Sequence, residues 1–213
     1  MTALRCEIDH LIVACGDLGQ GAAWLEARLG EAPQLGGKHA LMGTHNMLLR
    51  LGARIYLELI AIDPDAPAPQ RPRWFDLDTA HVRSRAQERP FLLTWAARTD
   101  RIVEAVTQVP ALGQVLALTR GPYAWRITVP EDGALQFGGV LPALLQWDGA
   151  AHPAEALEDR GCTLRRLALE HPAAGSVLPL FRELRVTGPV DLKPGPRALV
   201  AHIATPRGTV ELA

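Results

Sequence analysis

The sequence has no excess of charge of either sign: 22 lysines and arginines accompany 23 aspartates and glutamates. Without a positive field nothing attracts nucleic acid or an anionic membrane surface, so we expect neither as a partner. The chain also lacks any run near the roughly 20 apolar residues of a membrane span, and its first residues contain no apolar signal-peptide core. These absences predict a cytoplasmic protein.

Cysteine is scarce as well. Cys6, Cys15 and Cys162 are an odd number without CxxC spacing, which argues against a disulfide framework and against a cysteine-rich zinc site. We expect free, buried thiols. Apolar residues are plentiful instead, at 48% of 213 positions, enough for a sizeable core in one large domain or two small ones.

The order strand, helix, further strands occurs three times along the chain. The apolar run 4–14 predicts a strand, and Asp17 and Gly30 predict the start and stop of the helix that follows. The order returns near residue 90 and, shortened, near residue 162. The pattern predicts a single body, 1–213, with duplicated units at about 4–62, 90–148 and 162–213 and a proline-rich and charged surface loop at 63–89.

The run GTHNMLLRLGARIYLEL, residues 43–59, is typical of a β-hairpin but contains a histidine and a glutamate. A carboxylate among leucines needs a metal ion, a cationic side chain or a polar ligand as its partner. A two-residue turn at 52–53 would place Met47 opposite Glu58 and His45 on the same sheet face as Glu58. The hairpin therefore predicts one wall of a site.

Two further histidines follow the same logic of alternating side chains. In the first strand, His10 is expected on one face with Ile8, on the side of the hairpin glutamate. In the last hairpin, a turn at 207–208 would place His202 diagonal to Glu211 on one face. A one-residue error in a turn would move every side chain of a strand to the opposite face.

Short segments along nearly the whole chain carry a family resemblance: IDHLIVA, GGKHALMGTHNMLLRLG, YLELIAIDP, RPRWF, LLQWDGAAHP and HIATPRGTVEL. They resemble the glyoxalase-like domain family of the vicinal-oxygen-chelate superfamily (glyoxalase, bleomycin resistance, dioxygenase). The resemblance implies an α+β fold of repeated βαβββ units, with curved mixed, mainly antiparallel sheets around a cleft and helices outside. Pairing of units within one chain and pairing in a homodimer both stay open.

The resemblance also implies a ligand set. In metal-using members, a His or Gln on the first strand and a Glu on the last strand of each unit bind one divalent ion. His10 and Glu58 match in the first unit and Glu211 in the third, which suits Zn, Ni, Mn or Fe. The set is incomplete, because Arg166 falls at the third unit's histidine position and the middle unit offers Gln146 at its Glu position. A site without metal therefore stays open.

Several of these residues have a purely structural alternative. His10 could be a core histidine satisfied by local hydrogen bonds, Glu58 could pair with a neighbouring arginine, and His45 could fix the turn before its strand. The segment RPRWF, 71–75, is either a lid over the cavity or a surface loop pinned by one tryptophan.

Two functions are compatible with this sequence. The first is a metal-assisted lyase, isomerase or dioxygenase type of enzyme for a small oxygenated substrate, with Glu58 or Glu211 moving a proton. The second is a metal-free protein of the bleomycin-resistance type that binds or sequesters a small molecule. The placement of His10 with Glu58 favours the enzyme. The residues expected to contact the small-molecule ligand are His45, Asn46, Tyr56, Trp74, Gln146, Trp147, Arg166 and His202.

Overall fold

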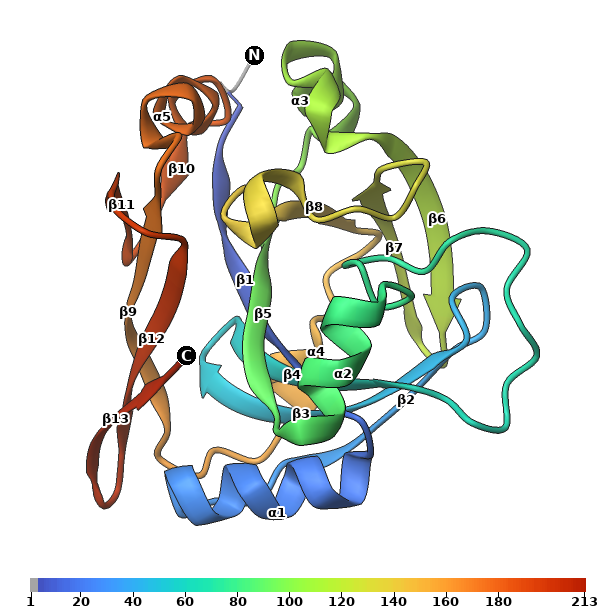
Figure 1. Cartoon of the computed structure of the whole chain (residues 1–213), viewed down its shortest axis with the longest axis vertical. Coiled ribbons are helices and arrows are strands. Elements are labelled where there is room, and N and C mark those ends of the chain that lie inside the picture. The colour runs from blue at the N-terminus through green and yellow to red at the C-terminus, as the bar shows by residue number, and fades with distance from the viewer. Residues whose placement is uncertain (1–3) are drawn as a thin grey trace.

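Residues 4–213 are described by the computed structural model, and they form two β-sheets (Figure 1). The larger sheet has the strand order β2-β3-β4-β1-β5-β8-β7-β6, with β10 beside β1, and the smaller sheet has the order β11-β9-β12-β13. The strands of the larger sheet are β1 (Cys6–Ala14), β2 (Gln34–His39), β3 (Thr44–Gly52), β4 (Ile55–Ile62), β5 (Phe91–Arg98), β6 (Gln114–Arg120), β7 (Tyr123–Val129), β8 (Ala143–Trp147) and β10 (Val186–Thr187). Those of the smaller sheet are β9 (Thr163–His171), β11 (Val190–Pro194), β12 (Ala198–Thr205) and β13 (Gly208–Leu212).

The helices of the described residues are short. They are α1 (Leu18–Leu29), α2 (Ala80–Glu88), α3 (Ile102–Gln108), α4 (Pro153–Ala156) and α5 (Ala174–Glu183), with 3₁₀ turns at Pro110–Leu112 and Gln136–Gly139. The predicted α+β class with curved mixed sheets is confirmed. No helix within residues 4–213 has the length and apolar character needed to cross a membrane.

The larger sheet repeats one strand order and curls into a half-barrel. The elements β1, α1, β2, β3 and β4 form its first half, and β5, α3, β6, β7 and β8 form its second half. The first strands of the two halves, β1 and β5, pair antiparallel at the centre. The outer strands β2 and β6 meet on the open side, where Arg120 Nη1 lies 3.2 Å from His39 Nε2. The first two units of the sequence thus build the larger sheet, to which the third unit adds the short β10; the other strands of the third unit form the smaller sheet.

Local sequence determines where α1 begins and ends. Asp17 Oδ1 accepts a hydrogen bond from Gln20 N at 2.8 Å, which satisfies a free backbone donor of the first turn. Gly30 ends the helix with a φ of 78°, which a residue without Cβ adopts readily. Leu25 and Leu29 are buried in the core between the helix and the sheet. The predicted cap and stop are confirmed.

The main apolar core lies on the outer face of the half-barrel, where the smaller sheet and α1 cover it. It joins alternate residues of β1 and β4 to residues of β9 and β12: Leu11, Val13, Leu57, Leu59, Leu167, Leu169, Ala201 and Ile203. Figure 1 shows the smaller sheet, orange to red, alongside β1 and β5. Because the outer face is covered in this way, any site between the two halves lies on the inner face.

The β3–β4 hairpin differs by one residue from the predicted register. Glu58 pairs with Leu48 instead of Met47, because the ladder is irregular between Arg50 and Gly52. This shift moves every β3 side chain to the opposite face, so the prediction that His45 shares a face with Glu58 was wrong. Asn46 takes that face instead.

A second irregularity occurs in β1. Ile8 pairs with Ala97 and His10 with Ala96, so Asp9 is an extra residue between them. Ile8 lies in the outer core, and the expectation that it shares a face with His10 was wrong. The bulge lets Asp9 reach the side chain of its neighbour His10, as described below.

The segment 63–89 is not the plain surface loop that its composition predicted. It contains α2, and Thr79 caps the first turn of this helix. Thr79 Oγ1 accepts a hydrogen bond of 3.3 Å from Val82 N. It also carries Trp74 and Phe75, which are 3% and 6% exposed and therefore belong to the interior. The three cysteines are free and buried, as expected.

Candidate functional site

A small enclosed cavity lies between the two halves of the half-barrel. About 20 Å³ is open to the centre of a water-sized sphere, which is room for about one or two water molecules. Its polar lining is His10, His39, Asn46, Tyr56, Glu58 and Arg120, and its apolar and aromatic lining is Trp74, Phe75, Trp125, Ile127, Leu145 and Trp147.

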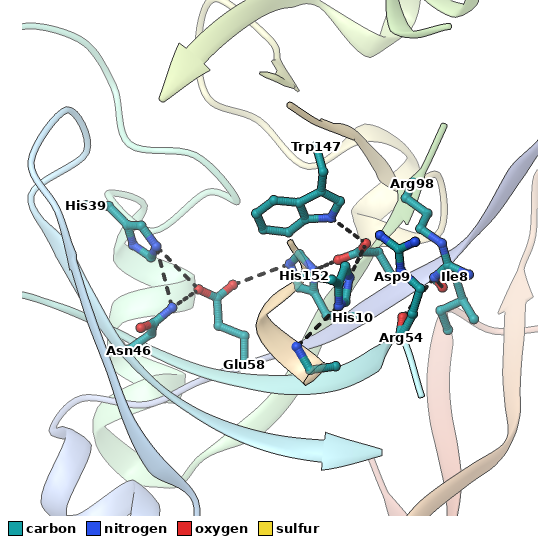
Figure 2. A network of polar contacts seen from close by, with 11 residues as sticks. Ile8, Asp9, His10, His39, Asn46, Arg54, Glu58, Arg98, Trp147 and His152 are labelled. Atoms are coloured by element: carbon teal, nitrogen blue, oxygen red, sulfur yellow. Dashed lines mark hydrogen bonds and ion pairs between the residues drawn. The ribbon is translucent and has the colours of Figure 1, made fainter. Parts of the chain in front are cut away.

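Glu58 on β4 is the buried carboxylate that the hairpin sequence pointed to. Asn46 Nδ2 donates a hydrogen bond of 2.6 Å to Glu58 Oε1 (Figure 2). The orientation of this amide is fixed, because its Oδ1 accepts from Gly37 N at 2.8 Å and from Arg120 Nη1 at 3.0 Å. The amide NH₂ must therefore face Glu58, which leaves Oε2 of the carboxylate for a second partner.

That second partner is His10 on β1. Its Nε2 lies 3.5 Å from Glu58 Oε2, and its ring stacks on Tyr56 with 4.5 Å between centroids. Its Nδ1 lies 2.7 Å from Asp9 Oδ1, so Nδ1 carries a hydrogen that the carboxylate accepts. Nε2 is therefore presented to Glu58, and a proton on either group can pass to the other.

Asp9 is fully buried and holds three donors together. Its Oδ2 accepts from Trp147 Nε1 at 2.9 Å and lies 3.1 Å from His152 Nε2, while Oδ1 faces His10 (Figure 2). Burial alone would raise the pKa of Asp9, but the hydrogen bonds and charges of the two histidines lower it well below its usual value. Asp9 therefore stays a carboxylate and fixes the His10 ring.

His39 on β2 is neutral in this site. Its Nδ1 lies 3.0 Å from Thr44 Oγ1, and its Nε2 lies 3.2 Å from Arg120 Nη1, a group that only donates. Burial lowers the pKa of His39 to about 4; the charge of Glu58 opposes this change and that of Arg120 adds to it. Nε2 thus serves as an acceptor for Arg120.

Two glycines in β2 make room for these contacts. The ladder between β2 and β3 is irregular from Leu35 to Lys38, and Gly36 and Gly37 lie in this irregular stretch. A Cβ on Gly36 would overlap Asn46 Oδ1, and one on Gly37 would lie 2.8 Å from Arg120 Cδ. Gly36 thus leaves room for Asn46, and Gly37 leaves room for Arg120.

The residues of this cavity do not fit a chelated divalent metal. Within residues 4–213, no group of three His, Cys, Asp or Glu side chains is arranged to hold one. In the second half, Ala96 lies opposite His10 and Leu145 lines the cavity on the last strand, so neither offers a ligand atom. The guanidinium of Arg120 also occupies the accepting nitrogen of His39. A positive charge is thus already present where an ion would need to bind.

Six of the residues predicted for the site line the cavity: His10, Asn46, Tyr56, Glu58, Trp74 and Trp147. Because Trp74 forms part of its wall, the segment 71–75 contributes to closing the cavity. His39 and Arg120 line it too, but they were missed because their contact spans 81 residues of sequence. Asp9 was missed because the alternation rule assigns it to the opposite face.

Five predicted residues lie elsewhere. His45 lies on the outer side of the sheet, where its Nδ1 is 4.0 Å from Asp63 Oδ1. Gln146 alternates along β8 with Leu145 and Trp147 and therefore faces away from the cavity. Its Oε1 accepts a hydrogen bond of 3.0 Å from Ile102 N at the start of α3. The remaining three, which are on the smaller sheet, are Arg166, His202 and Glu211.

The smaller sheet carries its own polar pairs, away from the cavity. His202 pairs directly with Glu211, with 3.2 Å between Nδ1 and Oε1, and Arg166 Nε donates to Asp191 Oδ2 at 2.7 Å. The predicted last turn was one residue too late, which shifts the pairing by two residues and therefore preserved the shared face of His202 and Glu211. Since this sheet packs on the outer core, Glu211 does not join His10 and Glu58 in a ligand set.

The chain belongs to the glyoxalase-like domain family, whose sequence model matches residues 8–184. The match includes every cavity residue and ends before β11, β12 and β13. Among curated proteins no sequence matches.

Solved structures are similar to this chain at low sequence identity. A hypothetical protein from Staphylococcus aureus has a TM-score of 0.59 at 12% identity, covering 97% of this chain and 84% of that chain. Methylmalonyl-CoA epimerase from Mycobacterium tuberculosis has a TM-score of 0.44 at 17% identity, covering 71% and 93%. A variant of the Streptomyces coelicolor epimerase in complex with 2-nitronate-propionyl-CoA has a TM-score of 0.46 at 18% identity, covering 71% and 100%. The likeness to the Staphylococcus aureus protein concerns the fold alone.

Proposed function

We propose that this protein is an enzyme of the isomerase or lyase type that moves a proton on a small oxygenated substrate. The observation that carries the proposal is the buried Glu58 carboxylate, with one oxygen held by Asn46 at 2.6 Å and the other 3.5 Å from His10 Nε2. A carboxylate and an imidazole facing each other in an enclosed cavity form a proton-transfer pair.

The chemistry follows from this pair. Glu58 Oε2 removes a proton from carbon next to a carbonyl group, and the electron pair of that C–H bond moves to the carbonyl oxygen to form an enolate. The guanidinium of Arg120 supplies positive charge and N–H donors for that oxygen. Return of the proton from Glu58 or His10 to the other face, or to the neighbouring carbon, completes an isomerisation. Departure of a leaving group from the enolate completes an elimination.

Asp9 and the aromatic walls support these steps. The Asp9 carboxylate holds His10 with Nε2 toward Glu58, and the stacked Tyr56 ring restrains the imidazole plane. Trp147 and Arg120 line the cavity and also border open grooves of about 390 and 260 Å³, respectively. Movement of either side chain joins the cavity to the groove that it borders, which gives a small substrate both a way in and room to bind.

Hydrogen exchange tests the proposal directly. Small ketones, 2-oxo acids and 2-hydroxy acids are incubated with the protein in D₂O, and loss of the proton next to the carbonyl or hydroxyl is followed by NMR. We expect exchange with at least one compound, at a rate that Glu58→Gln lowers by at least about 100-fold. Glu211→Gln, the same change on the smaller sheet, should leave the rate unchanged, and so should a chelator.

The same experiment separates the enzyme from a protein that only binds or sequesters a ligand. Binding of these compounds without exchange would favour the sequestering protein. Exchange that survives Glu58→Gln, or that disappears on chelation, would contradict the proposed roles of these residues.

A further inference from the structure

Arg120 carries a charge that no carboxylate in the described chain neutralises directly. Its contacts within residues 4–213 are with neutral groups: His39 Nε2 at 3.2 Å, Asn46 Oδ1 at 3.0 Å and the ring of Trp125 at 6.0 Å from the guanidinium carbon. Elsewhere in the protein, Arg98 pairs with Glu7 at 2.6 Å and Arg166 with Asp191 at 2.7 Å. Arg120 is therefore a half-buried cation whose position leaves an anionic partner to be supplied.

The surroundings hold Arg120 in place for such a partner. Gly37 leaves the space that its side chain occupies, since an added Cβ would lie 2.8 Å from Arg120 Cδ. Both contacts that fix the guanidinium use the same nitrogen, Nη1. Within the described part of the chain, Nη2 and Nε have no protein acceptor and remain available as donors, the arrangement with which arginine binds a carboxylate.

Trp74, another residue of the cavity lining, also has an unused donor. Trp74 is 3% exposed and lines the cavity, and its indole Nε1 has no hydrogen-bond partner among residues 4–213. A buried N–H group without an acceptor costs free energy that a ligand oxygen or a water can recover. Two residues of the cavity lining, Arg120 and Trp74, thus carry donors without a protein acceptor, whereas Glu58 already accepts from Asn46.

We propose that the substrate is a small carboxylate with a carbonyl or hydroxyl group on the neighbouring carbon, and that Arg120 binds its carboxylate. The inference rests on the proposed function, because it names the substrate class of the same cavity. Arg120 then has the role that a divalent ion has in metal-using relatives: it attracts the oxygens of the substrate and stabilises negative charge that develops on them.

Paired probes with and without charge test this assignment. Acetate and pyruvate are compared with acetamide and methyl pyruvate, which have similar shapes and no charge, by calorimetry and by the fluorescence of the cavity tryptophans. We expect the wild type to bind each carboxylate at least about 10-fold more tightly than its neutral counterpart. Arg120→Gln should abolish this preference, and Arg120→Lys should keep part of it, because lysine retains the charge without the planar fork.

Arg126→Gln is the matched control. Arg126 lies on the adjacent strand β7 and pairs with Asp148 at 3.3 Å on the outer side, so its replacement should not alter the preference. Equal affinity of the wild type for carboxylates and neutral probes, or a preference that Arg120→Gln retains in a folded protein, would overturn the inference. Thermal unfolding of each variant establishes that it is folded.

The two proposals fail in different ways. If carboxylate preference depends on Arg120 but no compound exchanges hydrogen, the binding inference stands and the enzymatic proposal fails. If exchange depends on Glu58 but neutral probes bind as well as carboxylates, the enzyme stands and the assignment of Arg120 is wrong.

Discussion

The two halves of the larger sheet share a strand order but not a chemistry. The first half supplies the proton-transfer pair, His10 and Glu58, together with Asp9 and Asn46, which form hydrogen bonds to it. The second half lines the cavity with Leu145, Ile127 and the aromatic ring of Trp125, and it contributes Arg120 from the end of β6. A duplicated fold thus allows one half to hold the reactive groups while the other shapes the space and provides the cation.

The largest expected effect comes from giving the second half a glutamate of its own. Leu145 is 2% exposed, lines the cavity and is paired with the apolar Ile127. We expect Leu145→Glu to lower the free energy of unfolding by about 3–5 kcal/mol, because it removes a packed apolar side chain and brings a second buried carboxylate into the cavity of Glu58, a cost that exceeds the attraction of Arg120. Urea denaturation measures the change.

Leu145→Met is the control for this substitution. It conserves volume and should cost less than about 1.5 kcal/mol. If Leu145→Glu were as stable as Leu145→Met, the two halves would tolerate a carboxylate equally, and the asymmetry between them would have no energetic basis.

The next largest effect is a pH dependence of stability that His39, in the first half of the larger sheet, should cause. His39 has a pKa of about 4 in the folded protein, against 6.5 for an unperturbed histidine, chiefly because it is buried. Between these values the unfolded chain binds a proton at His39 that the folded protein does not, so stability rises with pH across the window. The contribution of neutral His39 to the free energy of unfolding should be complete above pH 6.5. It should decline toward pH 4 by up to about 3 kcal/mol, at no more than about 1.4 kcal/mol per pH unit.

Denaturation curves at several pH values between 4 and 7 measure this slope. His39→Gln should flatten it, whereas His81→Gln, at an exposed position of α2, should leave it unchanged. A slope that His39→Gln does not alter would mean that His39 is protonated in the fold, which is incompatible with its acceptance of a hydrogen bond from Arg120.

The sequence predicted what local rules and the family resemblance determine. The limits of α1 follow from Asp17 and Gly30, and the α+β class and the pairing of His10 with Glu58 follow from the resemblance and from alternation. The errors arose at bulges. An extra residue near Arg50 turned His45 outward and Asn46 inward, and nothing in the alternation of apolar residues reveals such an insertion.

Contacts across the open side of the half-barrel could not be predicted from the sequence either. His39 and Arg120 meet only because the sheet curls until β2 and β6 approach each other. The expectation that Arg166 contacts the ligand placed an arginine at the site, but on the wrong sheet. Arg166 is exposed and bound to Asp191, whereas Arg120 lies in the cavity.

The smallest expected effect on stability tests how the two halves join. In Gly37→Ala, the new Cβ would lie 2.8 Å from Arg120 Cδ, a flexible side chain that can move away. We expect the free energy of unfolding to change by less than about 1 kcal/mol, since the only group that must move is the flexible side chain of Arg120. Carboxylate affinity should nevertheless fall by about 5- to 10-fold, because the guanidinium loses a charge-assisted contact with its ligand. Gly175→Ala, at a site on α5 with nothing within 4 Å, should change neither quantity. Unaltered carboxylate affinity in Gly37→Ala would mean that the first half does not position the cation of the second.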